Sequence, residues 1–407
     1  MKFGMFMMPS HPPGENPTLA FERDLQLIEH AERLGFDEVL IGEHHTGGWE
    51  TVPAPDLMIA AASQRTSRVR LGTAVINLPY HHPFDVAERV AFLDHLTHGR
   101  LIFGVGPGAL PTDFLMFGLA PDKLRPMMNE SLEIIMKLLS ADAPLTYDGE
   151  FWQLRDAFVQ VKPLQNPLPI AIACGISGNS VEQAGKYGMI PMSASIFSPA
   201  GADMLKRQWA AIQEAAGRHG QTVRREEWRI AQPVYVAETN EQALADIDRG
   251  ATREYHEYFF TLGLKGLFED YPGQPIGEIT TEQLKRKMGW LVGDPPTVTK
   301  MIRELYDGVD GFGGILFITN DWADQTKWMK SMELFARYVM PNFQGTSTGL
   351  TSSWNALEEK AKLWRAAIDA AGGIDKVVHN NLPQLGQDSI GRVAPEAGAA
   401  ARERKGS

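Results

Sequence analysis

The stretch Val39-Leu40-Ile41-Gly42-Glu43-His44-His45-Thr46 decides how the rest of the sequence is interpreted. A short apolar run with β-branched residues ends abruptly in a carboxylate and two imidazoles. It follows a segment with helical spacing, residues 18–34, which Gly35 can end. In a parallel β/α protein, a buried strand brings polar residues to the mouth of the sheet in this way. The stretch therefore predicts a buried strand with a polar site at its carboxyl end.

The composition is that of a globular protein of 407 residues, 43% hydrophobic and 22% charged. A net charge of -11 argues against nucleic acid as a partner. No run approaches the roughly 18 apolar residues that a membrane span needs, and the apolar start of the chain is too short for a signal peptide. The single cysteine, Cys174, allows no internal disulfide and fits a reducing compartment. We therefore expect a cytoplasmic protein with neither nucleic acid nor membrane as a partner.

Short apolar runs alternate with longer helical patterns along most of the chain, as in a parallel α/β fold. One run contains Pro233, which counts against a central strand unless a bulge accommodates it. Eight strands with intervening helices favour a closed (β/α)8 TIM barrel over an open doubly wound sheet. The expected strands are residues 3–8, 38–41, 69–76, 101–105, 168–173, 189–193, 228–237 and 313–318.

Three segments depart from this alternation. Residues 142–167 contain the turn Tyr147-Asp148-Gly149 and are expected to form a small insertion or hairpin. Residues 264–294 are rich in Gly, Pro and charge, which is typical of a lid. We expect the barrel to occupy residues 1–342 and a C-terminal extension to occupy residues 343–407, as a linker, a helix and a disordered tail. That helix carries Trp354 and Trp364 on one face, which the barrel or another subunit must cover.

Glu43, His44 and His45 are the first candidates for chemistry. Neighbouring residues on a strand point to opposite faces, so the two histidines are not expected to grip one ion, and we predict no metal site. One imidazole can act in the barrel mouth as a hydrogen-bond donor or as an acid or base. The alternative is a structural histidine that caps the strand end.

Two further stretches follow later strands. His81 and His82 precede Pro83 and either support the first site or bond backbone groups at the start of a helix. Gly106 and Gly108 leave the fourth expected strand, where glycines allow a ligand to approach the backbone. As a dinucleotide fingerprint this stretch is weak, because a third glycine at the required offset is missing.

The stretch after Cys174 offers a phosphate site. Ser177, Gly178, Asn179 and Ser180 precede a short helix, and free amides at a helix N-terminus bind anions. The alternative is an ordinary N-cap by Asn179 or Ser180. Cys174 itself is interpreted as a small apolar residue and not as a nucleophile.

With these stretches placed, the chain resembles the bacterial-luciferase-like, flavin-dependent monooxygenase family over about residues 1–341. The stretches 8–13, 49–50 and 336–341 are similar to limonene-monooxygenase-type members. The residues that carry the family resemblance are Glu43-His44-His45, Leu71-Gly72-Thr73-Ala74, Leu78-Pro79-Tyr80-His81-His82-Pro83, Ala87-Glu88-Arg89, Leu93-Asp94, Gly99-Arg100, Gly104-Val105-Gly106, Asp113-Phe114, Phe117-Gly118, Lys162-Pro163-Leu164-Gln165 and Ser177.

The resemblance implies a barrel that takes reduced FMN from a separate NAD(P)H:flavin reductase and reacts it with O2. A C4a-(hydro)peroxyflavin then oxygenates a small apolar, terpene-like substrate. His44 is the catalytic imidazole in this reading, with His45 and Glu43 in support. A homodimer is expected by analogy.

The resemblance also assigns the flavin's surroundings. Thr73 and Ala74 lie along the isoalloxazine, where the family often has a cis peptide, and Gly106 and Gly108 let the ring sit close. Asp113 belongs to the same surroundings. Residues 177–180 hold the phosphate, with Arg125 nearby. Pro107 is a departure, because family members often carry an arginine for the phosphate at that position.

Two other functions on the same barrel remain open at this point. A deazaflavin (F420)-dependent reductase or dehydrogenase would move hydride without O2, and a non-catalytic flavin-binding subunit would bind FMN without turnover. Glu43-His44-His45 favours the monooxygenase branch. A metal-dependent barrel hydrolase is a more distant alternative, which metal analysis would test.

Overall fold

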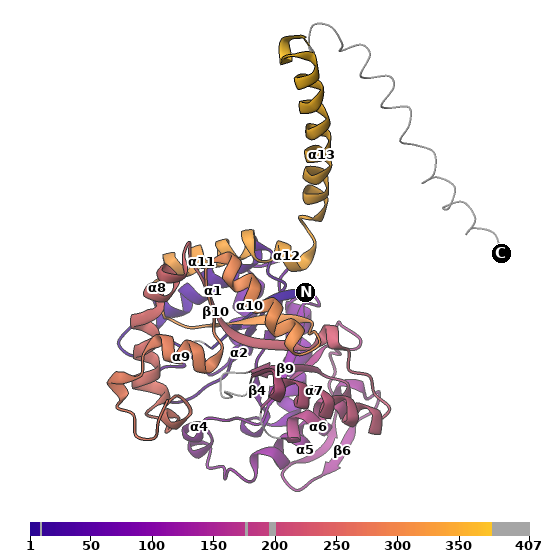
Figure 1. Ribbon diagram of the computed structural model, residues 1–407. Helices are drawn as coiled ribbons and strands as arrows, with labels where there is room; N and C mark the ends of the chain where they lie inside the picture. The colour runs from indigo at the N-terminus through magenta and orange to yellow at the C-terminus, as the bar shows by residue number, and fades with distance from the viewer. Residues whose placement is uncertain (9, 176–177, 195–200, 377–407) are drawn as a thin grey trace, which may run out of the picture. The chain divides into compact units, whose positions relative to one another are not determined.

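The computed structural model describes the whole chain except residues 9, 176–177, 195–200 and 377–407. Its main sheet is a closed parallel barrel (Figure 1), because β10 pairs with β9 on one edge and with β12 on the other, while β12 pairs with β1. This confirms the predicted fold. The eight barrel strands are β1 (Lys2–Met7), β2 (Glu38–Ile41), β3 (Arg70–Thr73), β5 (Leu101–Gly106), β8 (Ile170–Cys174), β9 (Ile190–Ala194), β10 (Arg229–Val236) and β12 (Gly314–Thr319).

Helices surround the barrel, and several begin and end at the residues expected from sequence. The first, α1, is capped by the side chain of Asn16 and ends at Gly35, whose φ of 84° suits a residue without a side chain. The helices around the barrel are α1 (Pro17–Leu34), α2 (Pro55–Ser63), α3 (Pro83–Leu96), α5 (Leu124–Ser140), α6 (Gly178–Tyr187), α7 (Gly201–Arg218), α8 (Asn240–Arg253), α10 (Pro295–Gly308) and α11 (Gln325–Tyr338), with the shorter α4 (Pro111–Met116), α9 (Thr281–Met288) and α12 (Pro341–Gln344).

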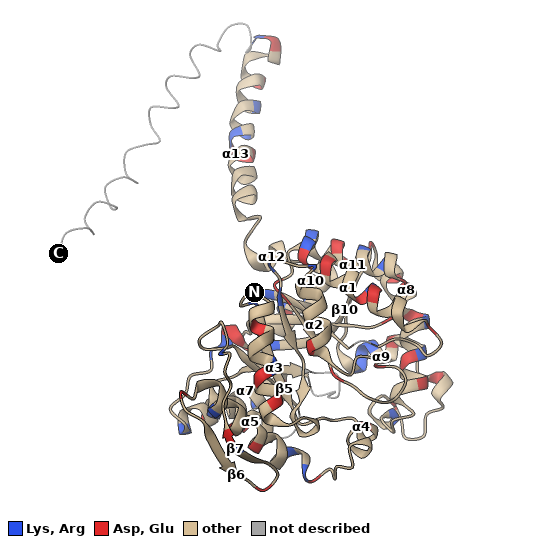
Figure 2. Cartoon of the chain, turned by 180° about the vertical axis from the view of Figure 1, so that it is seen from behind, with Lys and Arg blue, Asp and Glu red and all other residues tan. Residues whose placement is uncertain are grey.

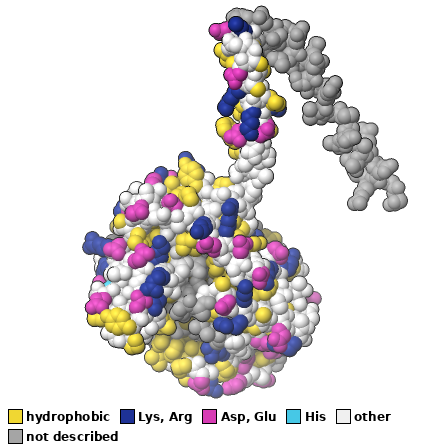
Figure 3. All heavy atoms as spheres, viewed as in Figure 1, with side chains coloured by type: hydrophobic (Ala, Val, Ile, Leu, Met, Phe, Trp, Pro, Cys, Tyr) yellow, Lys and Arg dark blue, Asp and Glu magenta, His cyan; other side chains and the backbone are white. Residues whose placement is uncertain are grey.

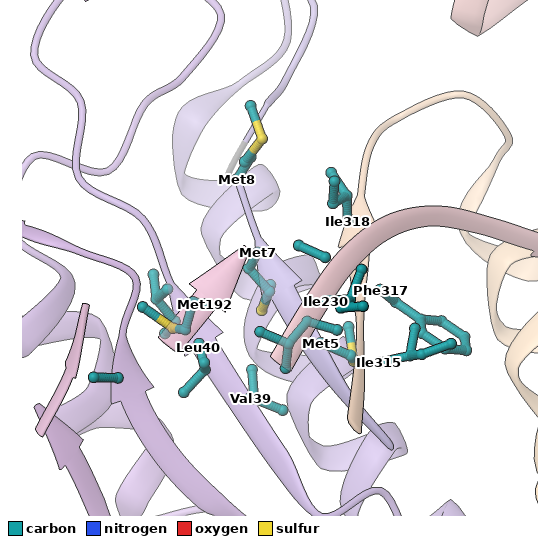
Figure 4. Close-up of a cluster of buried hydrophobic side chains, with 14 of the residues drawn as sticks. Met5, Met7, Met8, Val39, Leu40, Met192, Ile230, Ile315, Phe317 and Ile318 are labelled. Carbon is teal, nitrogen blue, oxygen red and sulfur yellow. The ribbon is translucent and has the colours of Figure 1, made fainter. Parts of the chain in front are cut away.

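The barrel interior is packed with side chains from alternate strand positions. A β-carbon on Gly72 would lie 2.6 Å from Leu40 Cδ2, so glycine leaves the room that the larger neighbour fills. Figure 4 shows Leu40 close to Met192, whereas Phe317 lies on the other side of β12, where it packs edge-on against Phe335 of α11. The two faces of the strands therefore serve an inner core and an outer layer against the helices.

Pro233 lies inside β10 without a bulge. On one side of β10, Pro233 is in register with Ile318 of β12. On the other side, the neighbour changes from β9, which pairs with residues 229–231, to β11 (Leu291–Gly293), which pairs with residues 234–236. Pro233 thus lies between the part of β10 that pairs with β9 and the part that pairs with β11. Its missing N–H therefore removes no hydrogen bond between strands on that side.

The two predicted insertions are both structured. Residues 142–167 contain the antiparallel hairpin of β6 (Leu145–Asp148) and β7 (Gln153–Ala157), which confirms the expected hairpin. Residues 264–294 hold two short 3-10 turns, helix α9 and strand β11, so they are more regular than expected. A lid role for this segment stays a prediction.

Contacts divide the chain into two units, residues 1–344 and 345–407. The described part of the second unit contains one long helix, α13 (Thr348–Ala371), which ends at Gly372. The expected disordered tail from about Gly386 lies outside the described residues. Among the described helices, none combines the length and the apolar character needed to cross a membrane.

Candidate active site

The loop that follows β2 brings the polar residues to the carboxyl end of the barrel. Backbone hydrogen bonds fix the loop at both ends, from Gly42 N to Met7 O at 2.9 Å and from His44 N to Val52 O at 3.1 Å. An isolated bridge between Ser10 and Glu50 holds its far side. The loop therefore folds back, so that Glu50 faces His44.

His44 lies between two buried carboxylates. Its Nδ1 donates to Asp113 Oδ2 at 2.9 Å, and its Nε2 lies 2.6 Å from Glu50 Oε2. Burial alone would lower the pKa of His44, but the charges of Glu50 and Asp113 outweigh it and raise the pKa to about 10. The His44 ring is therefore a cation at neutral pH, with a proton on each nitrogen.

The contact between His44 and Glu50 is a charge contact without hydrogen-bond alignment. Glu50 Oε2 is buried and accepts no hydrogen bond from the described residues, although His44 Nε2 is close. An aligned donor and a buried acceptor would normally be paired. The charged ring of His44 therefore faces a buried carboxylate oxygen across a short contact.

Asp113 organises this loop from helix α4. Its Oδ1 accepts from the backbone N–H of His45 at 3.1 Å and from the hydroxyl of Thr46 at 2.5 Å. Burial would raise the pKa of Asp113, but the hydrogen bonds from His44 and Thr46 lower it below its ordinary value. A charged Asp113 therefore fixes both the ring of His44 and the backbone that follows.

A second acidic group lies behind Glu50. Tyr258 donates its hydroxyl to Glu50 Oε1 at 3.1 Å, and it lies in a π-helical turn, η3 (Glu254–Phe259), at the end of α8. Such turns are rare and frequent at functional sites. Glu254 is buried there, accepts from Ser10 Oγ at 2.7 Å and also from Trp322 Nε1, and has a pKa raised by burial.

His45 belongs to a separate cluster around Glu43. Glu43 Oε1 lies 2.8 Å from His45 Nε2 and 2.8 Å from His81 Nε2, while Glu43 Oε2 accepts from the backbone N–H of Asn77 at 2.9 Å. Burial would raise the pKa of Glu43, but these hydrogen bonds lower it. With Nε2 as the donor to Glu43, the Nδ1 of His45 has no hydrogen-bond partner among the described residues.

The second histidine pair splits between two roles. His81 joins the Glu43 cluster. His82 is the N-cap of α3, where its Nδ1 accepts from the backbone N–H of Phe84 at 3.3 Å, which confirms the structural reading for that residue. Glu43, His45 and His81 are also close enough to bind one metal ion, but the hydrogen bonds to Glu43 account for their arrangement. The predicted absence of a metal stays a prediction.

The residues assigned to the flavin ring lie beside this loop, and their role toward the ring stays a prediction. Ala74 N donates to Ile41 O at 2.7 Å, and the Ala74–Val75 peptide bond is cis. The Thr73 hydroxyl is engaged by Gly104, to whose carbonyl it donates at 2.7 Å. Gly106 leaves room for the side chain of Val75, which would lie 2.5 Å from an added β-carbon.

Gly108 likewise serves a neighbouring side chain. A β-carbon there would overlap the hydroxyl of Tyr80, and the φ of 80° also favours glycine. The Tyr80 ring stacks on Phe117 with centroids 4.6 Å apart, and His45 meets Phe117 edge-on. The Tyr80 hydroxyl is buried and has no partner among the described residues. The glycines therefore shape an aromatic wall that carries an unpaired hydroxyl.

The predicted phosphate site is at the start of α6. Gly178 is exposed there, Ser180 is buried, and Asn179 exchanges hydrogen bonds with Asn129 of α5 at 3.0 and 3.2 Å. Ser177 lies outside the described residues. Arg125 is exposed and precedes Asn129 by about one helical turn on α5. Cys174 is buried, which raises the pKa of its thiol to about 12 and suits the apolar role expected for it.

The groups at the mouth are of the kind that a flavin needs. His44 offers a partly exposed, charged imidazole beside the aromatic wall of Tyr80 and Phe117, and the unpaired Tyr80 hydroxyl and Glu50 Oε2 are buried next to it. The free amides that begin α6 and the guanidinium of Arg125 suit a phosphate.

Sequence reasoning missed three residues of this site, namely Glu50, Glu254 and Tyr258. Glu50 entered only through the resemblance, as part of Trp49-Glu50. Glu254 and Tyr258 follow directly on α8, and only the π-helical turn brings Tyr258 to Glu50. A lone acidic residue within a run of aromatic residues was the one available signal.

Comparisons with known proteins identify the family of this chain. The family model for luciferase-like monooxygenases matches residues 1–309. The 4-hydroxyprotoasukamycin monooxygenase of Streptomyces nodosus subsp. asukaensis is 39% identical over 370 residues, which cover 90% of this chain and 99% of that protein. Limonene 1,2-monooxygenase of Rhodococcus erythropolis is 35% identical over 373 residues, which cover 91% of this chain and 94% of that protein.

A solved structure gives the same result for the barrel. The oxygenating constituent of 3,6-diketocamphane monooxygenase from Pseudomonas putida, in complex with FMN, is 28% identical. It matches with a TM-score of 0.71 and covers 84% of this chain and 98% of that chain. The predicted relationship and enzyme class are thereby confirmed: the chain belongs to the luciferase-like monooxygenase family.

Proposed function

We propose that this chain is the oxygenase of a two-component system. It takes reduced FMN from a separate NAD(P)H:flavin reductase and uses O2 to oxygenate a small apolar compound. The observation that carries the proposal is the His44 cation held between Asp113 and Glu50 at the mouth of the barrel. The similar 3,6-diketocamphane monooxygenase structure is an oxygenating constituent in complex with FMN. This supports FMN as the cofactor and a separate protein as the reductase.

His44 supplies a fixed positive charge and one directed N–H. Bound reduced FMN supplies the electrons that activate O2, and this places negative charge on oxygen. A cation in a partly buried site stabilises such charge far more than it would in water. Because the pKa of His44 is raised to about 10, the ring keeps this proton through the physiological range.

His45 has the complementary property. Its Nε2–H donates to Glu43, so its Nδ1 can accept a proton from a group in the site. Glu43 is held charged by three hydrogen-bond donors, so it can stabilise the imidazolium that then forms. We assign His44 as the proton-bearing donor and His45 as the proton acceptor.

The phosphate of FMN is assigned to the start of α6 and to Arg125. Pro107 provides no charge, so Arg125 is the cation that remains of those expected at the site. A charge-assisted hydrogen bond contributes about 1.5–3 kcal/mol, so Arg125→Ala should raise the Kd of reduced FMN roughly tenfold or more. Arg155→Ala is a matched control, because Arg155 is an exposed arginine paired with Asp148 on the hairpin. Equal affinity in both variants would exclude Arg125 from the phosphate site.

The substrate is assigned to a small apolar class by the lining of the mouth. Phe117 and Tyr80 stack beside His45, and Trp49 stacks on Tyr258 beside Glu50. Aromatic walls with few polar groups suit apolar ligands. The names of two relatives, which contain limonene and diketocamphane, support a terpene-like compound.

The test is to mix the protein with reduced FMN without air and then add O2. We expect a transient species that is neither reduced nor oxidised FMN, and its faster decay when a substrate is present, with one atom of ¹⁸O2 in the product. Direct reoxidation of FMN without a transient would contradict the proposal. Hydride transfer from a reduced deazaflavin in the same assay would favour the reductase alternative, and tight FMN binding without turnover would favour a binding subunit.

A further inference from the structure

Helix α13 carries a continuous apolar stripe along one face, and the second unit by itself buries none of its residues. Figure 3 shows hydrophobic side chains along the helix between charged ones. The stripe consists of Leu350, Trp354, Leu357, Ala361, Trp364 and Ile368.

The spacing of this stripe is that of a coiled coil. Its members recur at alternating intervals of four and three residues, which are the a and d positions of a heptad. With Trp354 at position a, Glu358 and Arg365 occupy e positions and Lys360 occupies a g position. The apolar stripe at positions a and d forms the seam between two paired helices. Side chains at e and g flank this seam and decide which helix pairs with α13 and in which direction.

We propose that α13 pairs antiparallel with α13 of a second copy of this chain. The pairing register is the one that places Ala361 opposite Trp364 of the second copy. The same register places Leu357 opposite Ile368, and Trp354 opposite Ala371. Each bulky tryptophan thus meets an alanine, which is the alternation of large and small residues that a closely packed helix pair needs.

The charges at the e positions agree with this register. Glu358 of each helix lies beside Arg365 of the other, so the pair contains two attractive contacts. Figure 2 shows that acidic and basic residues both occur along α13.

Other pairings of the same helices are less favourable. A parallel pair brings Lys360 beside Arg365 and Trp354 opposite its own copy. The antiparallel register that places Leu357 opposite Ala361 brings Trp354 opposite Trp364 and Glu358 beside Glu358. Size and charge therefore select one arrangement.

The segment that contains α13 is shared with two relatives. Matches that cover 90% and 91% of this chain are longer than the first unit of 344 residues, so both extend into residues 345–407. These monooxygenases therefore share with this chain some sequence beyond the first unit.

Charge exchange tests the register directly in the full-length protein. In sedimentation equilibrium, Glu358→Arg and Arg365→Glu should each weaken the dimer about tenfold, because two attractive pairs become repulsive. The double variant Glu358→Arg/Arg365→Glu should recover the wild-type Kd. Tighter dimers of Arg365→Glu would overturn the proposal in favour of a parallel pair, and a monomeric wild-type protein would overturn it altogether.

The apolar seam has its own matched control. Leu357→Lys should weaken the dimer by roughly a hundredfold, because it places a charge in the seam. Leu363→Lys changes a residue that is 74% exposed and lies off the seam, so it should leave the Kd unchanged. Equal effects of the two variants would contradict the heptad assignment.

Cross-linking keeps the proposal testable if another surface also holds the copies together. Chains with Glu358→Cys and chains with Arg365→Cys are mixed and treated with a short bis-maleimide. We expect dimers that join position 358 to position 365, and little joining of 358 to 358. The native Cys174 is buried and should not react. Preferential joining of 358 to 358, or efficient joining through Leu363→Cys, would overturn the antiparallel register.

Discussion

His44 and His45 are neighbours in the chain but have opposite surroundings. His44 lies between Asp113 and Glu50, carries a proton on both nitrogens and has a raised pKa. His45 shares a single carboxylate, Glu43, with His81, and its Nδ1 remains open. We assign the two adjacent imidazoles different roles, a fixed cation and a proton acceptor, because the number and direction of carboxylates around each ring differ. The comparison shows that the partners, and not the residue type, decide the chemistry.

The largest effect is expected from removal of the fixed cation. His44→Gln should lower the rate of substrate oxygenation roughly 10²–10³-fold, the range for loss of one preorganised electrostatic donor. The Kd of reduced FMN should change little, because the phosphate is bound elsewhere. Coupled turnover at the wild-type rate would remove His44 from the mechanism.

Removal of the proton acceptor should have a somewhat smaller effect. His45→Ala is expected to lower oxygenation by roughly 10²-fold, as for loss of one acid–base group. Added imidazole should restore part of this rate, because a free base can replace an open Nδ1. No rescue of His45→Ala by imidazole would remove His45 as the proton acceptor.

The variant Glu50→Gln tests the surroundings of His44 while both imidazole rings, His44 and His45, stay in place. The amide preserves size but removes one of the two charges that raise the pKa of His44, so that pKa should fall. The rate of oxygenation should therefore begin to fall at a lower pH than in the wild-type protein, because His44 loses its proton at a lower pH. Glu15→Gln, at an exposed carboxylate paired with Arg23, is the control. An unchanged rate in Glu50→Gln would show that Asp113 alone maintains the cation.

The smallest expected effect is on stability against pH. The folded-state pKa of His44 is about 10, against an ordinary value of 6.5. The folded protein therefore binds this proton more tightly, and the stabilisation is complete below about pH 6.5 and is lost as the pH rises through about 10. The free energy of unfolding, measured with urea, should thus fall more steeply above pH 7 in the wild-type protein than in His44→Gln. Parallel curves would contradict the raised pKa.

The fold was predictable because it depends on local patterns. Alternating strands and helices, Gly35 at the end of α1 and the turn at Tyr147-Asp148-Gly149 each act within a few residues, and the structure confirms them. The His82 cap is another local effect. Long-range pairing around the barrel then follows from the number of strands.

The site was predictable only in part, because its partners come from separate loops. The strand end identified Glu43, His44 and His45, but the position of Glu50 depends on a loop that folds back, and that of Tyr258 on a π-helical turn. The contacts that Gly106 and Gly108 make room for, with Val75 and Tyr80, were likewise not visible in the spacing of the glycines. Spacing does not reveal contacts that only tertiary packing creates.

The most direct test of the proposed mechanism is the protonation state of His44, observed by ¹⁵N nuclear magnetic resonance of protein labelled at its 11 histidines. The signals of His44 are identified by their loss in His44→Gln. At pH 8 we predict that both ring nitrogens of His44 show the shifts of protonated imidazolium nitrogens. One protonated and one unprotonated nitrogen would mean a neutral ring, and would contradict the assignment of His44 as the fixed cation.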